Sequence, residues 1–221
     1  IFTNLLLADE INRAPSKVQS ALLEVMQERQ VTIAENSFKL DEPFLVLATQ
    51  NPIEQEGAYT LPEAQLDRFM FKIVVGYNTK EEEYTIASKV ASNSFETINP
   101  ILNINELENI KKEIKNIHID KQLEDYILDI IFATRNPEKY DLKEIKHFIQ
   151  FGASPRATID MFKAVKAKAY LRGNDHVSPL DIASIIKDVL RHRIILSYEA
   201  QADDITTDDI IQKILIKIPI P

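Results

Sequence analysis

Leu5-Leu6-Leu7-Ala8-Asp9-Glu10 and Phe44-Leu45-Val46-Leu47-Ala48-Thr49-Gln50-Asn51-Pro52 are the two stretches that decide the fold. Each is an apolar run that ends abruptly in polar residues. Continuous apolar runs are typical of parallel strands covered on both faces, and ligands of such sheets bind beyond the carboxyl ends of the strands. We therefore expect Asp9, Glu10 and Asn51 at one edge of a parallel sheet. An Asp that holds Mg²⁺ through water, followed by a Glu that takes a proton from an attacking water, suits the hydrolysis of a nucleoside triphosphate.

Composition narrows the class of protein. The chain has 221 residues, of which 45% are hydrophobic and 27% charged, as in a soluble globular protein of one large or two modest domains. Neither a membrane-spanning run nor a signal peptide is predicted. The absence of cysteine excludes disulfides and thiolate chemistry and suits a reducing cytoplasm. A net charge of −8 argues against a protein that wraps nucleic acid over its whole surface.

A phosphate-binding loop is missing from this chain. The four glycines are followed by Ala, Tyr, Ala and Asn, so no glycine-rich loop ends in Gly-Lys-Ser or Gly-Lys-Thr. The sequence opens at Ile1, and the first apolar run follows almost at once. We expect a chain that begins in the middle of a domain.

The first third of the sequence predicts an α/β arrangement. Pro15 and the apolar spacing after it predict a helix over 16–28, and alternation around Asn36-Ser37 predicts a β-hairpin over 30–42. A short helix is expected over 63–68. Phe71 to Val75 reads as a further buried strand that ends at Gly76.

From Thr79 onward the apolar period changes to that of helices. Two amphipathic helices are expected around 104–117 and 123–131. Ser154-Pro155 and Ser178-Pro179 each supply an N-cap followed by proline, which predicts helices that run to about Leu171 and Ser197. The polar stretch from 91 to 105 is the expected linker, and Thr207-Asp208-Asp209 starts a last short helix.

Each candidate residue has an ordinary explanation beside the functional one. The ordinary explanation of Asp9 and Glu10 is that the strand ends there and the Asp caps the following helix. The ordinary explanation of Asn51 is an Asn-Pro turn. Arg68 lies just before the expected third strand and could reach a phosphate on a neighbouring subunit, or it could be a surface arginine paired with Asp67 or Glu63. Arg156 stands in the first turn of a helix, where the macrodipole disfavours a cation, so an anionic ligand would account for it. The ordinary alternative is a solvated arginine, and the helix position taken alone favours that alternative.

It is in these segments that the chain resembles a known family, the MoxR-type AAA+ ATPases. Residues 5–26, LLLADEINRAPSKVQSALLEVM, are similar to the Walker B strand and following helix of that family. Residues 44–71, FLVLATQNPIEQEGAYTLPEAQLDRFMF, resemble its sensor 1 strand and arginine-finger segment, and GASPRAT at 152–158 resembles its sensor 2 helix. The resemblance spans almost the whole chain.

The resemblance implies a role for each of these residues. Asp9 matches the Walker B residue that holds Mg²⁺ through water, Glu10 the catalytic base and Asn51 sensor 1. Arg68 matches the finger that acts in trans, and Arg156 matches the sensor 2 arginine that contacts ATP. The cofactors implied are therefore ATP and Mg²⁺.

The implied fold is a partial AAA+ P-loop NTPase core of the α/β class, a parallel sheet with helices, followed by an all-helical lid. The expected division is core 1–78, connecting helix and linker 79–105, and lid 106–221. The hairpin at 30–42 resembles the insertion before sensor 1 that marks this clade. Walker A and the helix 2 insertion, which precede Walker B in the family, are not in this sequence.

The function implied is that of a cytoplasmic chaperone-like ATPase that assembles as a homo-oligomeric ring, such as a hexamer, and remodels or activates partner complexes. Von Willebrand A-domain proteins are candidate partners. Two alternatives stay open: an inactive interaction or scaffold module, and a DNA-remodelling protein. The acidic surroundings of Lys39 in the hairpin disfavour nucleic acid, and the four lid cations at 163, 166, 168 and 172 read more simply as a solvated face. The four histidines show no ligand spacing, so no metal site is expected from them.

Overall fold

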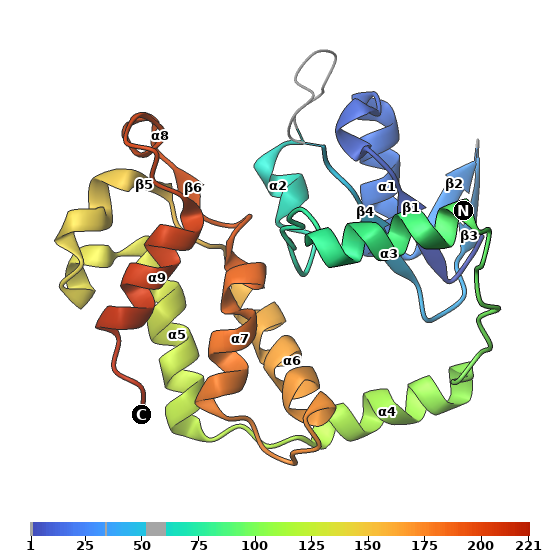
Figure 1. The fold of residues 1–221 in the computed structure, drawn as a ribbon. Coiled ribbons are helices and arrows are strands. Elements are labelled where there is room, and N and C mark those ends of the chain that lie inside the picture. Colours follow the sequence, from blue (N-terminus) through green and yellow to red (C-terminus); the bar gives the residue numbers. More distant parts are fainter. Residues whose placement is uncertain (1, 34, 52–60) are drawn as a thin grey trace.

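The α/β part is built on two parallel strands. The computed structural model describes residues 2–33, 35–51 and 61–221. Within them, β1 (Leu5–Ala8) pairs in parallel with β4 (Leu45–Ala48), and Ala8 lies opposite Ala48. The connection between them contains a 3-10 turn, η1 (Ile11–Arg13), helix α1 (Ser16–Glu28) and a hairpin of β2 (Gln30–Ile33) with β3 (Asn36–Lys39). The predicted parallel pairing, helix and hairpin are confirmed (Figure 1).

The two strands are covered on one face, not on both as predicted. Leu6, Ala8, Val46 and Ala48 pack against a small core of Ile11, Leu22 and Leu61. The alternate side chains stand on the other face and are more than half exposed, at 64% for Leu5, 62% for Leu7, 52% for Leu45 and 53% for Leu47. Side chains alternate along a strand, and in the described structure α1 and the turn after β1 supply cover to one face alone.

The third predicted strand is wrong. After the short helix α2 (Glu63–Leu66), residues 71–79 have no regular secondary structure, and Val74 and Val75 are 66% and 87% exposed. The backbone amide of Lys72 donates to the carbonyl of Asp188, on a helix of the C-terminal part, at 2.8 Å. Because this amide bonds to a helix, it is not available to a neighbouring strand.

Two capped helices connect the α/β part to the C-terminal part. Thr79 and Glu82 form a capping box for α3 (Lys80–Ala91), and Asn103 and Glu106 form one for α4 (Ile104–Asn116). The predicted linker at 91–105 is therefore shortened at both ends, because Ala91 belongs to α3 and Ile104 to α4. Helix α4 reaches the C-terminal part by packing on helix α6 (Pro155–Leu171) (Figure 1).

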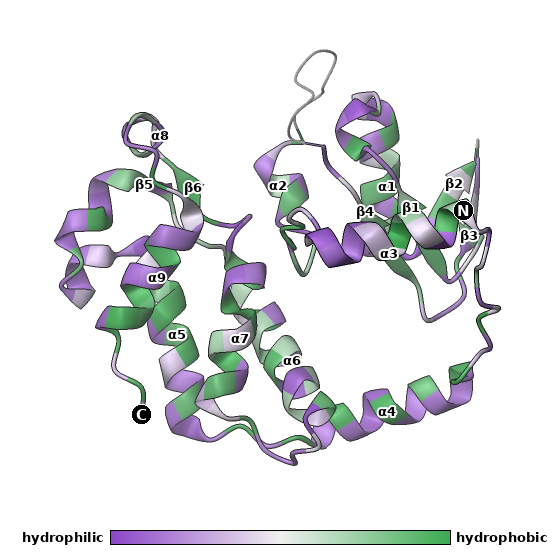
Figure 2. Cartoon of the chain, in the orientation of Figure 1, coloured by the Kyte–Doolittle hydropathy of each residue, from purple (hydrophilic) through white to green (hydrophobic). Residues whose placement is uncertain are grey.

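The C-terminal part is a helical bundle with short connecting elements. Their bounds are α5 (Lys121–Arg135), η2 (Pro137–Tyr140), η3 (Lys143–Phe148), β5 (Ile149–Phe151), α6 (Pro155–Leu171), α7 (Pro179–Leu190), β6 (Ile195–Leu196), α8 (Tyr198–Ala202) and α9 (Thr207–Lys217). Fully buried side chains from α5, α6, α7 and α9, such as Ile130, Met161, Ile186 and Ile210, make one continuous core. Figure 2 shows hydrophobic residues on α5, α7 and α9, where these helices face one another.

The predicted N-caps are confirmed, but one helix is shorter than expected. Ser154 and Ser178 accept hydrogen bonds from the first turns of α6 and α7. Helix α7 ends at Leu190 and does not reach Ser197, because Ile195 and Leu196 pair with β5 as a short antiparallel strand. None of the helices in the described ranges is long and apolar enough to cross a bilayer.

Candidate active site

Asp9 and Glu10 lie at the carboxyl end of β1, where Thr49 of the neighbouring strand end joins them. The Thr49 hydroxyl donates to Asp9 Oδ1 at 2.5 Å and accepts from the Glu10 amide at 2.8 Å. The Ile11 amide donates to the Thr49 carbonyl at 3.0 Å, and the Thr49 amide to the Ala8 carbonyl at 3.1 Å. The hydrogen bonding between the two parallel strands thus continues past their ends into the candidate site. The Thr49 hydroxyl links Asp9 to Glu10 there.

Glu10 has a left-handed backbone. Its φ of 48° and ψ of 50° are uncommon for a residue with a side chain, and strain of this kind often marks functional positions. The two hydrogen bonds to Thr49 hold this turn in place. The Glu10 carboxylate pairs with Arg13 at 3.1 Å on the next turn of chain, and both side chains remain partly exposed.

Asn51 closes the same edge. Asn12, in the 3-10 turn after Glu10, donates to the Asn51 carbonyl at 3.4 Å. The structure therefore brings Asp9, Glu10 and Asn51 to the ends of adjacent strands, as the sequence predicts. The Pro52 to Thr60 segment that follows lies outside the described residues.

The donor set at this edge fits a hydrated magnesium ion. Asp9 is exposed and offers a carboxylate, and Thr49 sets the direction of one of its oxygens. Mg²⁺ is bound by one or two carboxylates plus waters and phosphate oxygens more often than by an all-protein cage. Within the part of the chain described, no group of three or more His, Asp or Glu side chains is arranged to hold a metal by itself.

Arg68 and Arg156 belong to a second cluster, centred on Asp67. Asp67 accepts from the Ser154 hydroxyl at 2.8 Å, from Arg156 Nη1 at 3.1 Å and from Arg193 Nε at 3.1 Å. Arg156 is the sequence candidate on α6, and Arg68 follows Asp67 directly along the chain. The Nε of Arg68 is buried with no hydrogen-bond partner among the described residues.

The two clusters are built separately. Among the residues that the structure describes, no hydrogen bond or ion pair joins Asp9, Glu10 or Thr49 to Arg68 or Arg156. Arg156 contacts Asp67 and so stands beside the Arg68 turn. The candidate acidic residues Asp9 and Glu10 therefore lie in one cluster, and the candidate arginines lie in the other.

Sequence reasoning missed Thr49 and Arg193, and it did not identify the partners of Asp67. Thr49 could have been found from register, because Ala8 opposite Ala48 puts Thr49 next to Asp9. Asp67 was considered as a partner of Arg68, yet in the structure it pairs with two arginines of the C-terminal part. Arg193 carried no sequence signal, since it lies where the α7 helix was expected to continue.

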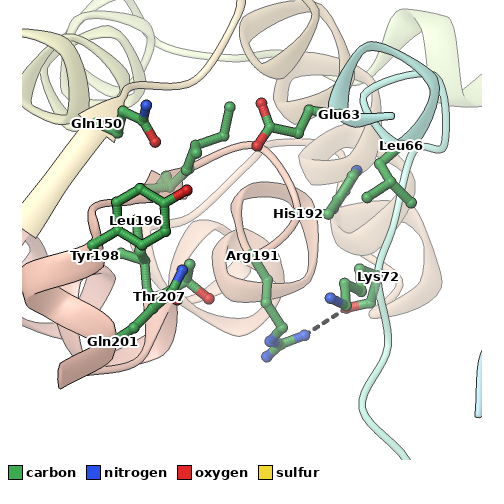
Figure 3. Close-up of a pocket in the computed structure, with 12 residues that line it drawn as sticks. Glu63, Leu66, Lys72, Gln150, Arg191, His192, Leu196, Tyr198, Gln201 and Thr207 are labelled. Atoms are coloured by element: carbon green, nitrogen blue, oxygen red, sulfur yellow. Dashed lines mark hydrogen bonds between the residues drawn. The ribbon is translucent and has the colours of Figure 1, made fainter. Parts of the chain in front are cut away.

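A cavity of about 410 Å³ lies between α2 and the β6–α8 region. Figure 3 shows Glu63 and Leu66 of α2 on one side, Tyr198 and Gln201 on the other, and His192 between them. Burial, and next to it the Arg193 charge, lowers the pKa of His192 to about 4. His192 is 8% exposed and therefore lies in the interior beside this cavity.

The cations on α6 make contacts within the C-terminal part. Lys166 donates to the Lys115 carbonyl at 3.0 Å, and Arg172 pairs with the buried Asp181 at 3.3 Å. Two of the four lid cations therefore have protein partners. This is a second argument against a nucleic-acid surface, beside the net negative charge of the chain.

Comparison with known proteins gives two family matches, one to each part of the fold. Residues 1–71 match the ATPase family associated with various cellular activities (AAA), and residues 143–214 match the AAA lid domain. The chain thus combines an AAA α/β segment with an AAA lid, which defines the class of protein as AAA+.

Individual relatives narrow the class. The chain is 47% identical to the chaperone MoxR1 of Mycobacterium tuberculosis over all of its length and 58% of that protein, and 39% identical to YeaC of Bacillus subtilis over 67% of that protein. A crystal structure of a candidate ATPase from Cytophaga hutchinsonii superposes with a TM-score of 0.95 at 49% identity, covering all of this chain and 67% of the other. The chain belongs to the MoxR-type AAA+ ATPases, and it spans less than two thirds of the length of MoxR1.

Proposed function

We propose that the protein carrying this chain is a cytoplasmic ATPase that assembles as a homo-oligomeric ring, such as a hexamer, and uses ATP hydrolysis to remodel or activate partner proteins. Proteins with a von Willebrand A domain are the candidate partners. The observation that carries the proposal is the Asp9–Thr49–Glu10 arrangement at the ends of parallel strands, in a chain of the MoxR family. The phosphate-binding loop would come from sequence that this chain does not contain.

The acid and base roles follow from chemistry. Asp9 would hold Mg²⁺ through its water shell, and the ion would supply charge neutralisation at the β- and γ-phosphates. Glu10 would take the proton from the attacking water after release from Arg13, and Asn51 would orient that water or the γ-phosphate. The hydrogen bond from the Glu10 amide to Thr49 fixes the backbone of Glu10 directly after Asp9 at the end of the strand, which limits the backbone freedom lost on reaction.

The arginines would act on charge that develops during hydrolysis. Arg68 would reach the ATP of the neighbouring subunit, and arginines of this kind are worth about 10³ to 10⁵ in turnover. Arg156 would contact the ATP of its own subunit and would have to exchange Asp67 for a phosphate oxygen. Both steps place positive charge where the transition state is most negative.

The test is Glu10→Gln in the full-length protein. We expect ATP binding to persist and phosphate release to fall by about 10²-fold or more, because the general base is lost while Asp9 and the nucleotide contacts remain. Glu42→Gln is the matched control, since Glu42 pairs with Arg29 beside the hairpin and away from the strand ends. Binding and turnover that both survive in Glu10→Gln would contradict the role of Glu10.

The same measurement separates the alternatives. A full-length wild-type protein that binds partner proteins but shows neither ATP binding nor phosphate release would be an interaction module. Turnover that is stimulated by DNA would favour the DNA-remodelling alternative.

A further inference from the structure

Arg193 is a fully buried arginine at the junction between the C-terminal bundle and the turn that carries Arg68. Its side chain is 0% exposed and pairs with Asp67 at 3.1 Å and Asp160 at 2.6 Å. It also donates to backbone carbonyls on both sides of the junction, which are those of Asp67, Phe69, Met70 and Val189. The planar fork of an arginine satisfies this many acceptors in one fixed geometry, which a lysine cannot do.

These contacts bracket Arg68 along the chain. Asp67 precedes it and holds Arg193 through both its carboxylate and its carbonyl, while the Phe69 carbonyl after it accepts from Arg193 at 2.8 Å. His192 donates to the same Phe69 carbonyl at 2.8 Å. The residues on either side of Arg68 are thus attached to one short segment, 192–193.

The attachment continues beyond Phe69. Arg191 donates to the Lys72 carbonyl at 2.5 Å, and the Lys72 amide donates to the Asp188 carbonyl at 2.8 Å. Figure 3 shows Lys72 joined to Arg191 by a hydrogen bond at the edge of the cavity, on the same side as Leu66 of α2. The C-terminal end of α7 therefore serves as the support for the whole 67–72 turn.

Burial makes this support rigid. Asp67 is 14% exposed and Asp160 is 18% exposed, so both carboxylates have lost most of their water. Arg193 compensates the charge of Asp160, and it shares the compensation of Asp67 with Arg156. Removing one partner of a buried ion pair is strongly destabilising, because it leaves the other charge buried and uncompensated. The turn is therefore held in one position, although the buried Nε of Arg68 has no hydrogen-bond partner among the residues that the structure describes.

We propose that Arg193 is a positioning residue for Arg68, fixing the 67–72 turn to the lid so that Arg68 is presented in one geometry to the neighbouring subunit. The inference rests on the proposed function, in which Arg68 acts in trans. It adds a consequence: movement of one subunit's lid moves the arginine that serves the next subunit. Lid position and the neighbour's turnover are thereby linked through Asp67 and Arg193.

The experiment uses Arg193→Lys in the full-length ring. Lysine keeps a positive charge between Asp67 and Asp160 but loses the fork, so the fold is retained and the turn loosens. We expect ATP affinity to be unchanged and turnover to fall by about 10²-fold, the effect of a displacement near 1 Å at a catalytic group. Arg172→Lys is the matched control, because Arg172 also pairs with a buried carboxylate, Asp181, but at the opposite end of α6.

Mixed rings test whether the loss acts through Arg68. Excess Glu10→Gln subunits have an inactive site of their own but an intact Arg68 and Arg193, so they present a correctly held arginine to their neighbours. We expect turnover per Arg193→Lys subunit to recover toward that of wild type in these rings. Arg68→Ala subunits, mixed in the same way, calibrate the rescue.

The outcomes separate the two proposals. Wild-type turnover in Arg193→Lys rings, a loss that mixed rings do not restore, or failure of the variant to fold or assemble would each overturn the positioning role of Arg193. Rescue of Arg68→Ala with no rescue of Arg193→Lys would leave the proposed function intact and remove this inference alone. Absence of turnover in the wild-type ring, or of rescue for Arg68→Ala, would overturn the proposed function and the inference with it.

Discussion

Thr49 is the residue whose contribution to the candidate site is easiest to isolate. Its hydroxyl bonds to both Asp9 and the Glu10 amide, so Thr49→Val removes two hydrogen bonds without changing side-chain shape. We expect phosphate release by the full-length protein to fall about tenfold, equivalent to about 1.4 kcal/mol in the barrier, because the backbone hydrogen bond from Ile11 to the Thr49 carbonyl then holds the Glu10 turn without help from the hydroxyl. Thr49→Ser keeps the hydroxyl and is expected to keep the rate. Equal rates in the two variants would show that the hydroxyl does not organise the site.

His192 supplies a prediction about pH. Burial lowers its pKa to about 4, from an ordinary value of 6.5, so the folded protein keeps the ring neutral while the unfolded chain protonates it below 6.5. Its contribution to stability is therefore fully present above pH 6.5 and is lost as pH falls toward 4. The loss over this window is about 3 kcal/mol.

The measurement is urea unfolding at several pH values between 7 and 4, on the wild type and on His192→Gln. The glutamine amide can still donate to the Phe69 carbonyl but does not titrate. We expect the wild type to lose more stability than the variant over this range. Parallel curves for the two proteins would mean that His192 is protonated in the fold or is accessible to water.

At the scale of elements, Gly152 limits how α5 and α6 approach each other. A Cβ at this position would lie 2.4 Å from the Thr134 carbonyl oxygen and 2.7 Å from the Arg135 amide, both backbone atoms near the end of α5. Gly152→Ala is expected to lower the free energy of unfolding by about 1–3 kcal/mol, as overpacking does. Thermal melting checks this.

Two other glycines give controls for that prediction. A Cβ at Gly76 meets nothing within 4 Å, so Gly76→Ala is expected to be close to neutral. Gly173 has open space too but a φ of 76°, so alanine there costs about 1–2 kcal/mol from backbone strain alone. Melting temperatures that fall equally for Gly76→Ala and Gly152→Ala would contradict the steric explanation.

The elements also show what sequence reasoning can and cannot reach. Local signals predicted β1, α1, the hairpin, β4 and the N-caps at Ser154 and Ser178, because strand runs, turn residues and caps act over a few neighbouring residues. The Phe71–Val75 strand and the extension of α7 beyond Leu190 were wrong for a different reason. Both segments have suitable local patterns, but bonds between them, such as Lys72 to Asp188 and Arg191, decide their conformation.

Some residues of the candidate site could likewise be placed from local sequence signals, and others could not. Asp9, Glu10 and Asn51 could be placed from sequence because they end adjacent strands. The surroundings of Arg68 and Arg156 could not, since Asp67 and Arg193 are 126 residues apart and meet only in the folded chain. Long-range ion pairs between buried groups leave no periodic trace in the sequence.

At the scale of the whole molecule, the chain carries the candidate magnesium-binding acid, base and arginine residues but no glycine-rich phosphate loop. Carboxylates repel the nucleotide's phosphates unless backbone amides and a lysine compensate, and in P-loop NTPases the Walker A loop supplies both. We therefore expect the 221-residue chain to bind Mg·ATP far more weakly than the full-length protein. Calorimetry on the two samples, followed by phosphate release from each, measures the difference.

The comparison of the two samples tests which residues bind the phosphates. Binding and turnover in the full-length protein alone would place Asp9, Glu10 and Arg156 on one side of a site whose other side lies outside this sequence. Glu10→Ala in the full-length protein provides the control, because removal of a carboxylate without loss of the loop should leave binding intact or tighten it. Tight binding by the 221-residue chain, with turnover that Glu10→Gln abolishes, would contradict this division, and backbone amides within residues 1–221 would then have to hold the phosphates.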